Sequence, residues 1–319
     1  MKSSVLVAGA ANLDRMMYVE RIPDIGEPIL AKGYEEHPGG KGANQAVSAA
    51  LWGQPVCFLG RIGSDEPGKI LRSAMEKAGV NTDYLLEGST PSGMALDFID
   101  LEGNYQAGVL AGSNADLDGG DLPMENALWE SIGLTVLQLE CPLSFNEAVG
   151  LESKKSGIPV LLNAAPAQTI PDTWWSWLEF LVVNEVEAES LSGVKIMGLQ
   201  EAYYCLEKLM DRLDQVLITL GAEGLVYGKG SERIHIPGHA VPVVSTLGAG
   251  DAFVGVLAAE LCRGQDLHDS ALIANLAAAA SVAKTGAQSS YITPDELKCD
   301  PLLGNLYNKE YLDGYLNNS

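Results

Sequence analysis

The sequence predicts an α/β protein built on a mostly parallel sheet that helices cover on both faces. Short runs rich in Val, Ile and Leu recur along the chain, with helical stretches between them. These runs are apolar throughout, which is typical of strands buried on both faces. Small or polar residues follow them, as at Asn12, Glu140, Asn163, Asn184 and Gly221. Open α/β sheets bind ligands at the carboxyl ends of their strands, so we expect the site along that edge.

Each element follows from the same pattern. Six apolar runs predict strands at residues 5–8, 56–59, 135–139, 159–162, 180–183 and 216–219. Five longer stretches predict helices at residues 43–52, 69–78, 199–213, 252–262 and 270–283. Alternation of strands and helices is the signature of βαβ units, which connect parallel strands.

Two early stretches do not fit this alternation. Residues 15–38 carry Pro and Gly between short β-like pieces, and residues 93–111 alternate around a hairpin turn at 101–104. We expect them to form a small β-lid over the sheet edge, within a single domain that spans residues 1–319. A lid of strands has open edges and an apolar face that a second copy would cover, which favours a homodimer. The acidic, Tyr-rich tail beyond residue 294 predicts a terminal helix packed on the core.

Composition excludes several classes of protein. The 319 residues include 20 Lys+Arg and 42 Asp+Glu, a net charge of −22, so nothing neutralises the phosphates of a nucleic acid in bulk. An apolar content of 47% excludes disorder. The five cysteines are scattered without a CxxC pair, which fits a reducing compartment. No apolar run reaches the roughly 18 to 20 residues of a membrane span, and no signal peptide begins the chain, so we expect a cytoplasmic protein.

The strongest candidate site is Gly248-Ala249-Gly250-Asp251, which opens an apolar helix. Backbone N–H groups at a helix N-terminus form an anion hole, and glycines let phosphate oxygens approach closely. Asp251 has two interpretations: an acid that complements the helix dipole, or a general base for phosphoryl transfer. A dinucleotide-binding loop would need a third glycine, and a Walker loop near Lys41 would need glycine where Glu35 stands.

A second candidate is Gly39-Gly40-Lys41-Gly42, which leads into a helix whose first turn carries Asn44. The glycines would let a polyhydroxylated ligand lie against the backbone while Asn44 binds hydroxyls. Asn12 and Asp14, after the first strand, offer further partners for vicinal hydroxyls. The alternative is structural, because such residues also satisfy turns and helix entries.

The chain resembles the ribokinase family of sugar kinases, the PfkB carbohydrate kinases. The motifs that carry this resemblance follow in the family's order: Asn12-Leu13-Asp14, Gly39-Gly40-Lys41-Gly42-Ala43-Asn44-Gln45-Ala46, Ala111-Gly112-Ser113-Asn114-Ala115, Gln138-Leu139-Glu140, Asn163-Ala164-Ala165-Pro166-Ala167, Asn184-Glu185-Val186-Glu187, Thr219-Leu220-Gly221, Gly248-Ala249-Gly250-Asp251 and Lys284-Thr285-Gly286-Ala287-Gln288. It implies a ribokinase-like three-layer sandwich and ATP-dependent phosphorylation of a sugar. The string from 39 to 46 favours D-ribose as acceptor, giving D-ribose 5-phosphate and ADP.

The resemblance also implies a role for each matching residue. Asp251 would be the base, and Gly248, Ala249 and Gly250 the anion hole. The sugar would be held by Asn12, Asp14, Gly40, Lys41, Asn44, Glu140 and Asp251. The nucleotide would contact Asn184, Thr219, Gly221, Gly224 and Asn275. Glu187 would place Mg²⁺ through water, and a monovalent cation would lie near Ser245, Leu247, Gly286 and Ser290. Ser245 stands where these kinases usually have an Asp, so we expect K⁺ activation to be weakened or absent.

Alternatives remain at the level of the substrate. Another acceptor on the same scaffold, such as 2-keto-3-deoxygluconate, fructose or adenosine, would depend on lid residues; Met16, Met94, Leu96 and Tyr105 are candidates. A sugar-binding sensor without catalysis is a further alternative, motivated only by Ser245. The intact Asp251 and its glycines argue against it.

Overall fold

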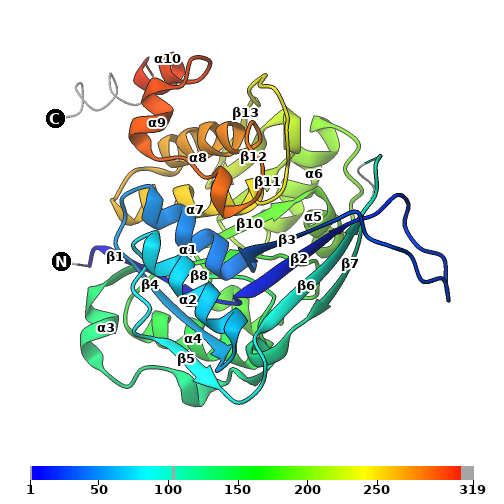
Figure 1. The fold of residues 1–319 in the computed structure, drawn as a ribbon. Coiled ribbons are helices and arrows are strands. Elements are labelled where there is room, and N and C mark those ends of the chain that lie inside the picture. Colours follow the sequence, from blue (N-terminus) through cyan, green and yellow to red (C-terminus); the bar gives the residue numbers. More distant parts are fainter. Residues whose placement is uncertain (1, 103–104, 310–319) are drawn as a thin grey trace.

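A nine-stranded sheet runs through the centre of the protein, as seen in the computed structural model, which describes residues 2–102 and 105–309 (Figure 1). From β11 to β5 every neighbouring pair is parallel, and β12 and β13 add an antiparallel edge. In spatial order the strands are β13 (Glu232–Ile236), β12 (Leu225–Lys229), β11 (Gln215–Thr219), β10 (Phe180–Asn184), β9 (Val160–Asn163), β8 (Ile132–Leu137), β1 (Ser4–Ala8), β4 (Val56–Gly63) and β5 (Leu85–Gly88).

Helices cover both faces of this sheet, so the strands are apolar on both sides. In β1, Val5 and Val7 join one hydrophobic core while Leu6 and Ala8 join the other. The first core is closed by α1 (Lys41–Leu51), α2 (Glu66–Lys77), α7 (Ala249–Cys262), α8 (Leu267–Ser281) and α9 (Pro294–Cys299). The second is closed by α3 (Asn126–Ser131), α4 (Leu143–Lys155), α5 (Glu185–Ser192) and α6 (Leu199–Met210). Three layers result, which confirms the predicted fold class.

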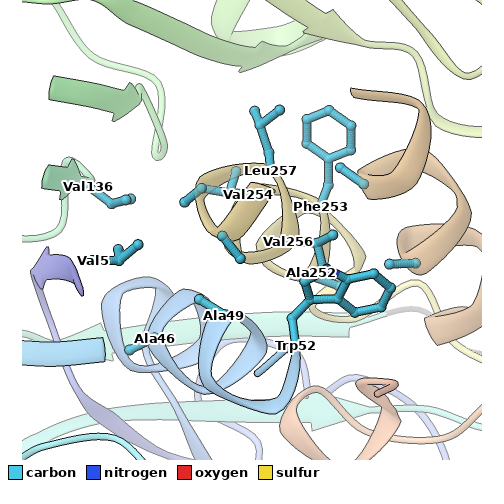
Figure 2. Packing of buried hydrophobic residues seen from close by; sticks show 14 of the residues in the cluster. Val5, Ala46, Ala49, Trp52, Val136, Ala252, Phe253, Val254, Val256 and Leu257 are labelled. Carbon is cyan, nitrogen blue, oxygen red and sulfur yellow. The ribbon is translucent and has the colours of Figure 1, made fainter. Parts of the chain in front are cut away.

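Helix α7 lies at the centre of the first core. Every residue from 251 to 260 is buried, as expected for a helix that is apolar all round. Figure 2 shows Phe253, Val256 and Leu257 leaving the helix in different directions, with Ala46 and Ala49 of α1 beside it. The small side chains of α1 let the two helices pack closely, and this contact positions the candidate base.

A second, four-stranded sheet projects from the edge of the first (Figure 1). Its strands, in spatial order, are β3 (Gly33–Gly39), β2 (Asn12–Tyr18), β6 (Gly93–Ile99) and β7 (Tyr105–Leu110). It is called the small sheet below. The two outer pairs are antiparallel, and the central pair β2–β6 is parallel. Gly103 and Asn104 of the predicted hairpin turn lie outside the described residues.

All six predicted strands and all five predicted helices are present, with ends shifted by a few residues. The sequence analysis did not identify α4, α5 or the β12–β13 pair. In the tail, α9 and α10 (Gly304–Tyr307) form, and Tyr307 is buried against Trp52 with ring centroids 6.2 Å apart. Tyr311 and Tyr315 lie outside the described residues. Among the helices that the structure describes, none has the length and apolarity to cross a membrane.

Candidate active site

The N-terminus of α7 forms the centre of the site. Gly248 is the N-cap residue and has a φ of 76°, a conformation that favours glycine. Ala249 and Gly250 follow in the first turn, and a Cβ built on Gly250 has no neighbour within 4 Å. The first N–H groups of a helix have no acceptor within the helix. This turn therefore offers accessible donors and the positive end of the helix dipole to an anion.

Asp251 is buried in the same turn, and two amide groups fix its carboxylate. Asn44 Nδ2 donates to Asp251 Oδ2 at 3.0 Å, and Gln45 Nε2 donates to Asp251 Oδ1 at 2.9 Å. Both donors come from the start of α1. Close packing of α1 on α7 makes these contacts: a Cβ on Gly255 would lie 2.5 Å from Ser48 Cβ, and Ser48 Oγ donates to Ala252 O.

Further amides hold the two donors in place. Gln45 Oε1 accepts from Gln138 Nε2 at 2.7 Å, and Gln45 Nε2 also donates to Asn163 Oδ1 at 3.0 Å. Asn44 Oδ1 accepts from Gln288 Nε2 at 3.0 Å. Gln45 and Gln138 are fully buried. The sequence analysis quoted these residues in motifs and gave them no role, since nothing in a linear string shows that they meet.

Acidic groups surround Lys41 on the other side of Asp251. Lys41 N, in the first turn of α1, donates to Glu140 Oε2 at 2.8 Å, just after β8. The pKa of Lys41 is raised: burial works against its charge, but the carboxylates of Asp251, Glu140, Glu187 and Asp14 outweigh burial. Burial raises the pKa of Glu140, and Lys41 opposes this change.

Asp14 lies on β2 of the small sheet, within electrostatic range of the same groups. Burial raises its pKa to about 7; Asp97, Glu140 and Asp251 add to this effect, and Lys41 opposes it. The Asp14 side chain fills the space that a side chain at Gly39 would occupy, because a Cβ there would lie 2.0 Å from Asp14 Oδ2. Asp14, Lys41, Asn44, Glu140 and Asp251 therefore form one cluster.

Asn12 and Gly40 lie at the base of the small sheet. Asn12 is buried, and its Oδ1 accepts from Asn114 Nδ2 at 2.9 Å. Gly40 caps α1 with a φ of 85°, and a Cβ there would lie 2.7 Å from Asn12 N. The structure thus gives the Asn12 amide a local partner, while Gly40 lets the chain turn into α1.

A second helix N-terminus lies at the sheet edge, where α5 follows β10. Asn184 Oδ1 accepts from Glu187 N at 3.0 Å, and Glu187 Oε2 accepts from Asn184 N at 2.9 Å, which forms a capping box. Glu187 is buried, and burial raises the pKa of its carboxyl group. The conserved geometry of a capping box thus accounts for part of this motif, and the buried acid faces the field of Lys41.

The remaining predicted nucleotide residues lie beside β11 and β12. Gly221 has open space around it, and Gly224 has a φ of 87° where a Cβ would lie 2.1 Å from Ile236 O. Thr219 ends β11. Asn275 of α8 donates from Nδ2 to Pro237 O at 2.9 Å, so it supports the loop that follows β13.

The residues predicted for a monovalent cation supply no carboxylate. Ser245 Oγ accepts from Leu247 N at 3.3 Å, and Ser290 Oγ donates to Ala287 O at 2.7 Å, while Gly286 has a φ of 83°. The nearby Tyr291 hydroxyl is buried and has no hydrogen-bond partner among the described residues. Within residues 2–102 and 105–309, no group of three or more His, Cys, Asp or Glu side chains is arranged to hold a metal ion.

Comparison with known proteins places this site in a family. The model of the pfkB family carbohydrate kinase matches residues 2–294. The chain is 35% identical over 299 residues to the ribokinase of Haemophilus influenzae, covering 93% of this chain and 97% of that protein. It is 33% identical to a deoxyribokinase of Salmonella typhi, with 90% and 95% covered. The structure of Arabidopsis thaliana ribokinase complexed with ribose and ATP has a TM-score of 0.85 and 31% identity, with 92% and 96% of the chains covered. The chain therefore belongs to the pfkB family of carbohydrate kinases, as its motifs predicted.

Proposed function

We propose that this protein is an ATP-dependent ribokinase that converts D-ribose and ATP to D-ribose 5-phosphate and ADP. The observation that carries the proposal is the carboxylate of Asp251, which is held by two amides in the first turn of α7. A proton acceptor and an anion hole thus share one helix turn. Ribokinases are among the relatives with the same length and fold, and one of them binds ribose and ATP.

The geometry supports a direct transfer. Asp251 accepts the proton from the primary hydroxyl of the sugar as that oxygen attacks the γ-phosphorus of ATP. The N–H groups of Gly248, Ala249 and Gly250 bind the oxygens of the phosphoryl group. The bond from the phosphorus to the β-phosphate oxygen breaks, and ADP leaves. A positioned base contributes about 10²- to 10⁴-fold to the rate, and one oxyanion donor about 10²- to 10³-fold.

The sugar would be held by the acidic cluster. Asp14 and Glu140 accept hydrogen bonds from hydroxyl groups, and Asn44 offers its amide beside Asp251. The main chain at Gly40 and Lys41 gives a surface without side chains on which the sugar ring can lie. Asn12 acts through the base of the small sheet, where its amide is already bonded to Asn114.

The nucleotide would bind along β10, β11 and α8, at Asn184, Thr219, Gly221, Gly224 and Asn275. Mg²⁺ would neutralise charge on the phosphates, and the residues present fit it. Glu187 is a buried acid whose pKa is raised by burial, a state that a nearby cation would relieve. Both of its oxygens accept hydrogen bonds from Asn184, so water would carry the contact to the ion.

A monovalent cation fits the residues less well. Ser245 provides a neutral hydroxyl, and the Ser290 hydroxyl is bonded to a backbone carbonyl. Backbone carbonyls near Leu247 and Gly286 would be the remaining ligands. We therefore propose that K⁺ activates this enzyme weakly or not at all.

We further propose that the small sheet is a lid that closes over the sugar, and that two lids pair in a homodimer. The open edges at β3 and β7 support the pairing, as do the exposed side chains of Tyr34, Val109 and Leu110. Light scattering on the eluted protein measures this directly, and a monomer at micromolar concentration would refute it.

The function is tested by measuring ADP release with D-ribose, 2-deoxyribose, fructose, 2-keto-3-deoxygluconate and adenosine, with Mg²⁺, with and without K⁺. Asp251→Asn should abolish turnover. Asp269→Asn is the matched control, because Asp269 holds the same third position in the first turn of α8. Preference for another acceptor would keep the kinase and discard ribose. Ribose binding without turnover would support a sensor.

A further inference from the structure

The register of the small sheet determines which of its side chains face the acidic cluster. In the parallel β2–β6 pair, Asp14 lies opposite Ala95, and Met16 opposite Asp97. Alternate residues of a strand share a face, so these four residues lie on one face, called the inner face here. Asp14 interacts electrostatically with Glu140 and Asp251, which shows that this face is directed at the site.

The same register moves two expected specificity residues away from the site. Met94 and Leu96 alternate with Ala95 and Asp97, so they lie on the opposite face of β6. Of the candidates named from the sequence, Met16 lies on the inner face. Asp97 was not a candidate, since its place opposite Met16 depends on the pairing of two strands that are about 80 residues apart.

Asp97 differs from the other acids of the small sheet. Glu35 bonds to His37 and Tyr18, and Glu36 bonds to Arg15. Asp97 is half-buried and makes no hydrogen bond or ion pair with any residue that the structure describes. A half-buried carboxylate without a partner is unfavourable until a donor satisfies it. On the inner face, that donor would come from the bound acceptor.

The charge of the acceptor site supports a choice among acceptors. Asp14, Asp97, Glu140 and Asp251 bring four negative groups, and Lys41 is the cation that interacts with three of them. Such a field repels a carboxylate or a phosphate on the acceptor. It favours hydroxyl groups and amines, which donate hydrogen bonds to carboxylates.

We propose that Asp97 is a specificity-determining residue, which accepts a hydrogen bond from the acceptor and excludes anionic sugars. The inference rests on the proposed kinase function. Asp97 lies one residue pair further from the base of the small sheet than Asp14, so it reads the part of the acceptor beyond the hydroxyls that Asp14 holds. The chemistry recognised is a hydrogen-bond donor, either a hydroxyl or an ammonium group. The class selected is therefore a neutral or cationic polyol.

Two variants separate the hydrogen bond from the charge. Asp97→Leu removes both, and Asp97→Asn keeps an acceptor oxygen and removes the charge. Glu36→Gln removes one negative charge from the opposite face of the same sheet and serves as the control. Thermal melting first confirms that each variant is folded. Initial rates with D-ribose, 2-amino-2-deoxyribose and 2-keto-3-deoxygluconate, together with calorimetric ribose binding, are then compared.

We expect Asp97→Leu to raise KM and Kd for ribose on the order of 10-fold, with kcat changed less than about 3-fold. Asp97→Asn should leave ribose within about 3-fold. Both should raise the kcat/KM of the keto acid relative to ribose by roughly 10-fold, and lose preference for the amine. Unchanged ratios in both Asp97 variants would overturn the inference. If the wild-type chain turns over no sugar, the proposed function fails, and ribose Kd values still decide the role of Asp97.

Discussion

Asp14 should destabilise the free enzyme at neutral and alkaline pH. Its pKa is raised from 3.8 to about 7 by burial and by the carboxylates of Asp97, Glu140 and Asp251, with Lys41 acting in the opposite direction. A carboxyl group with a raised pKa in the folded state costs nothing below the unfolded pKa, where it is protonated in both states. The cost grows as the pH rises from about 4 to about 7 and is complete above that range.

The replacement Asp14→Asn removes this cost and keeps the shape of the side chain. A shift of about 3 pKa units corresponds to about 4 kcal/mol at pH 8, and the part already present at pH 5 is about 1.6 kcal/mol. The stability of the variant relative to wild type should therefore increase by about 2.5 kcal/mol between pH 5 and pH 8. An unfolding entropy of about 2.1 cal/mol/K per residue makes 1 kcal/mol equal to about 1.5 °C for this chain, so the expected change is about 4 °C.

The assay is thermal melting of both proteins at pH 5 and pH 8, without ligand. Comparing the two pH values cancels any effect of the amide that does not depend on pH. Asp24→Asn is the control, since that side chain is 91% exposed and should show no such difference. Ribose at millimolar concentration should stabilise wild type and lose most of this effect in the variant. The reasoning is refuted if the melting difference between Asp14→Asn and wild type is the same at both pH values.

Two further changes probe groups behind the site. Gln45→Met keeps the length of the side chain and removes the donor to Asp251, so kcat should fall on the order of 10- to 100-fold while KM for the sugar changes little. Steady-state kinetics measure this, and a rise in KM alone would contradict it. Glu260→Ala leaves Trp52 Nε1 and Arg263 without a buried acceptor, which should cost about 3 kcal/mol in urea unfolding. A loss below about 1 kcal/mol would show that neighbouring groups compensate.

The sequence predicted the layers of the fold because both faces of the main sheet are buried. A strand such as β1 is then apolar throughout, and its pattern is visible without knowledge of its neighbours. The order of strands in the sheet could not be predicted in this way. The β12–β13 pair lies at an edge, where Tyr227 and Ile234 are partners in an antiparallel hairpin. Its alternation of polar and apolar residues is weaker than that of the buried strands.

The same distinction holds for the site. Asp251 was found because its partners in the anion hole are adjacent in sequence. Gln45 and Asn44 are about 200 residues from Asp251 and meet it only because Gly255 and Ser48 let two helices pack closely. Asp97 required the register of β6 on β2. Roles carried by one turn could thus be predicted, and roles that depend on packing or strand pairing could not.

The site unites two regions of opposite electrostatic character, and this resolves how so acidic a chain can accept ATP. The acceptor side gathers Asp14, Asp97 and Glu140, so the proton of the sugar hydroxyl moves toward a carboxylate. The donor side presents the N-termini of α5 and α7, whose N–H groups and dipoles favour phosphate oxygens. Asp251 lies at the boundary, with its carboxylate turned to the amides of α1 and its backbone in the first turn of α7. Because the boundary is one helix turn wide, proton and phosphoryl group move in opposite directions over a short path, and the net charge of −22 does not oppose the reaction locally.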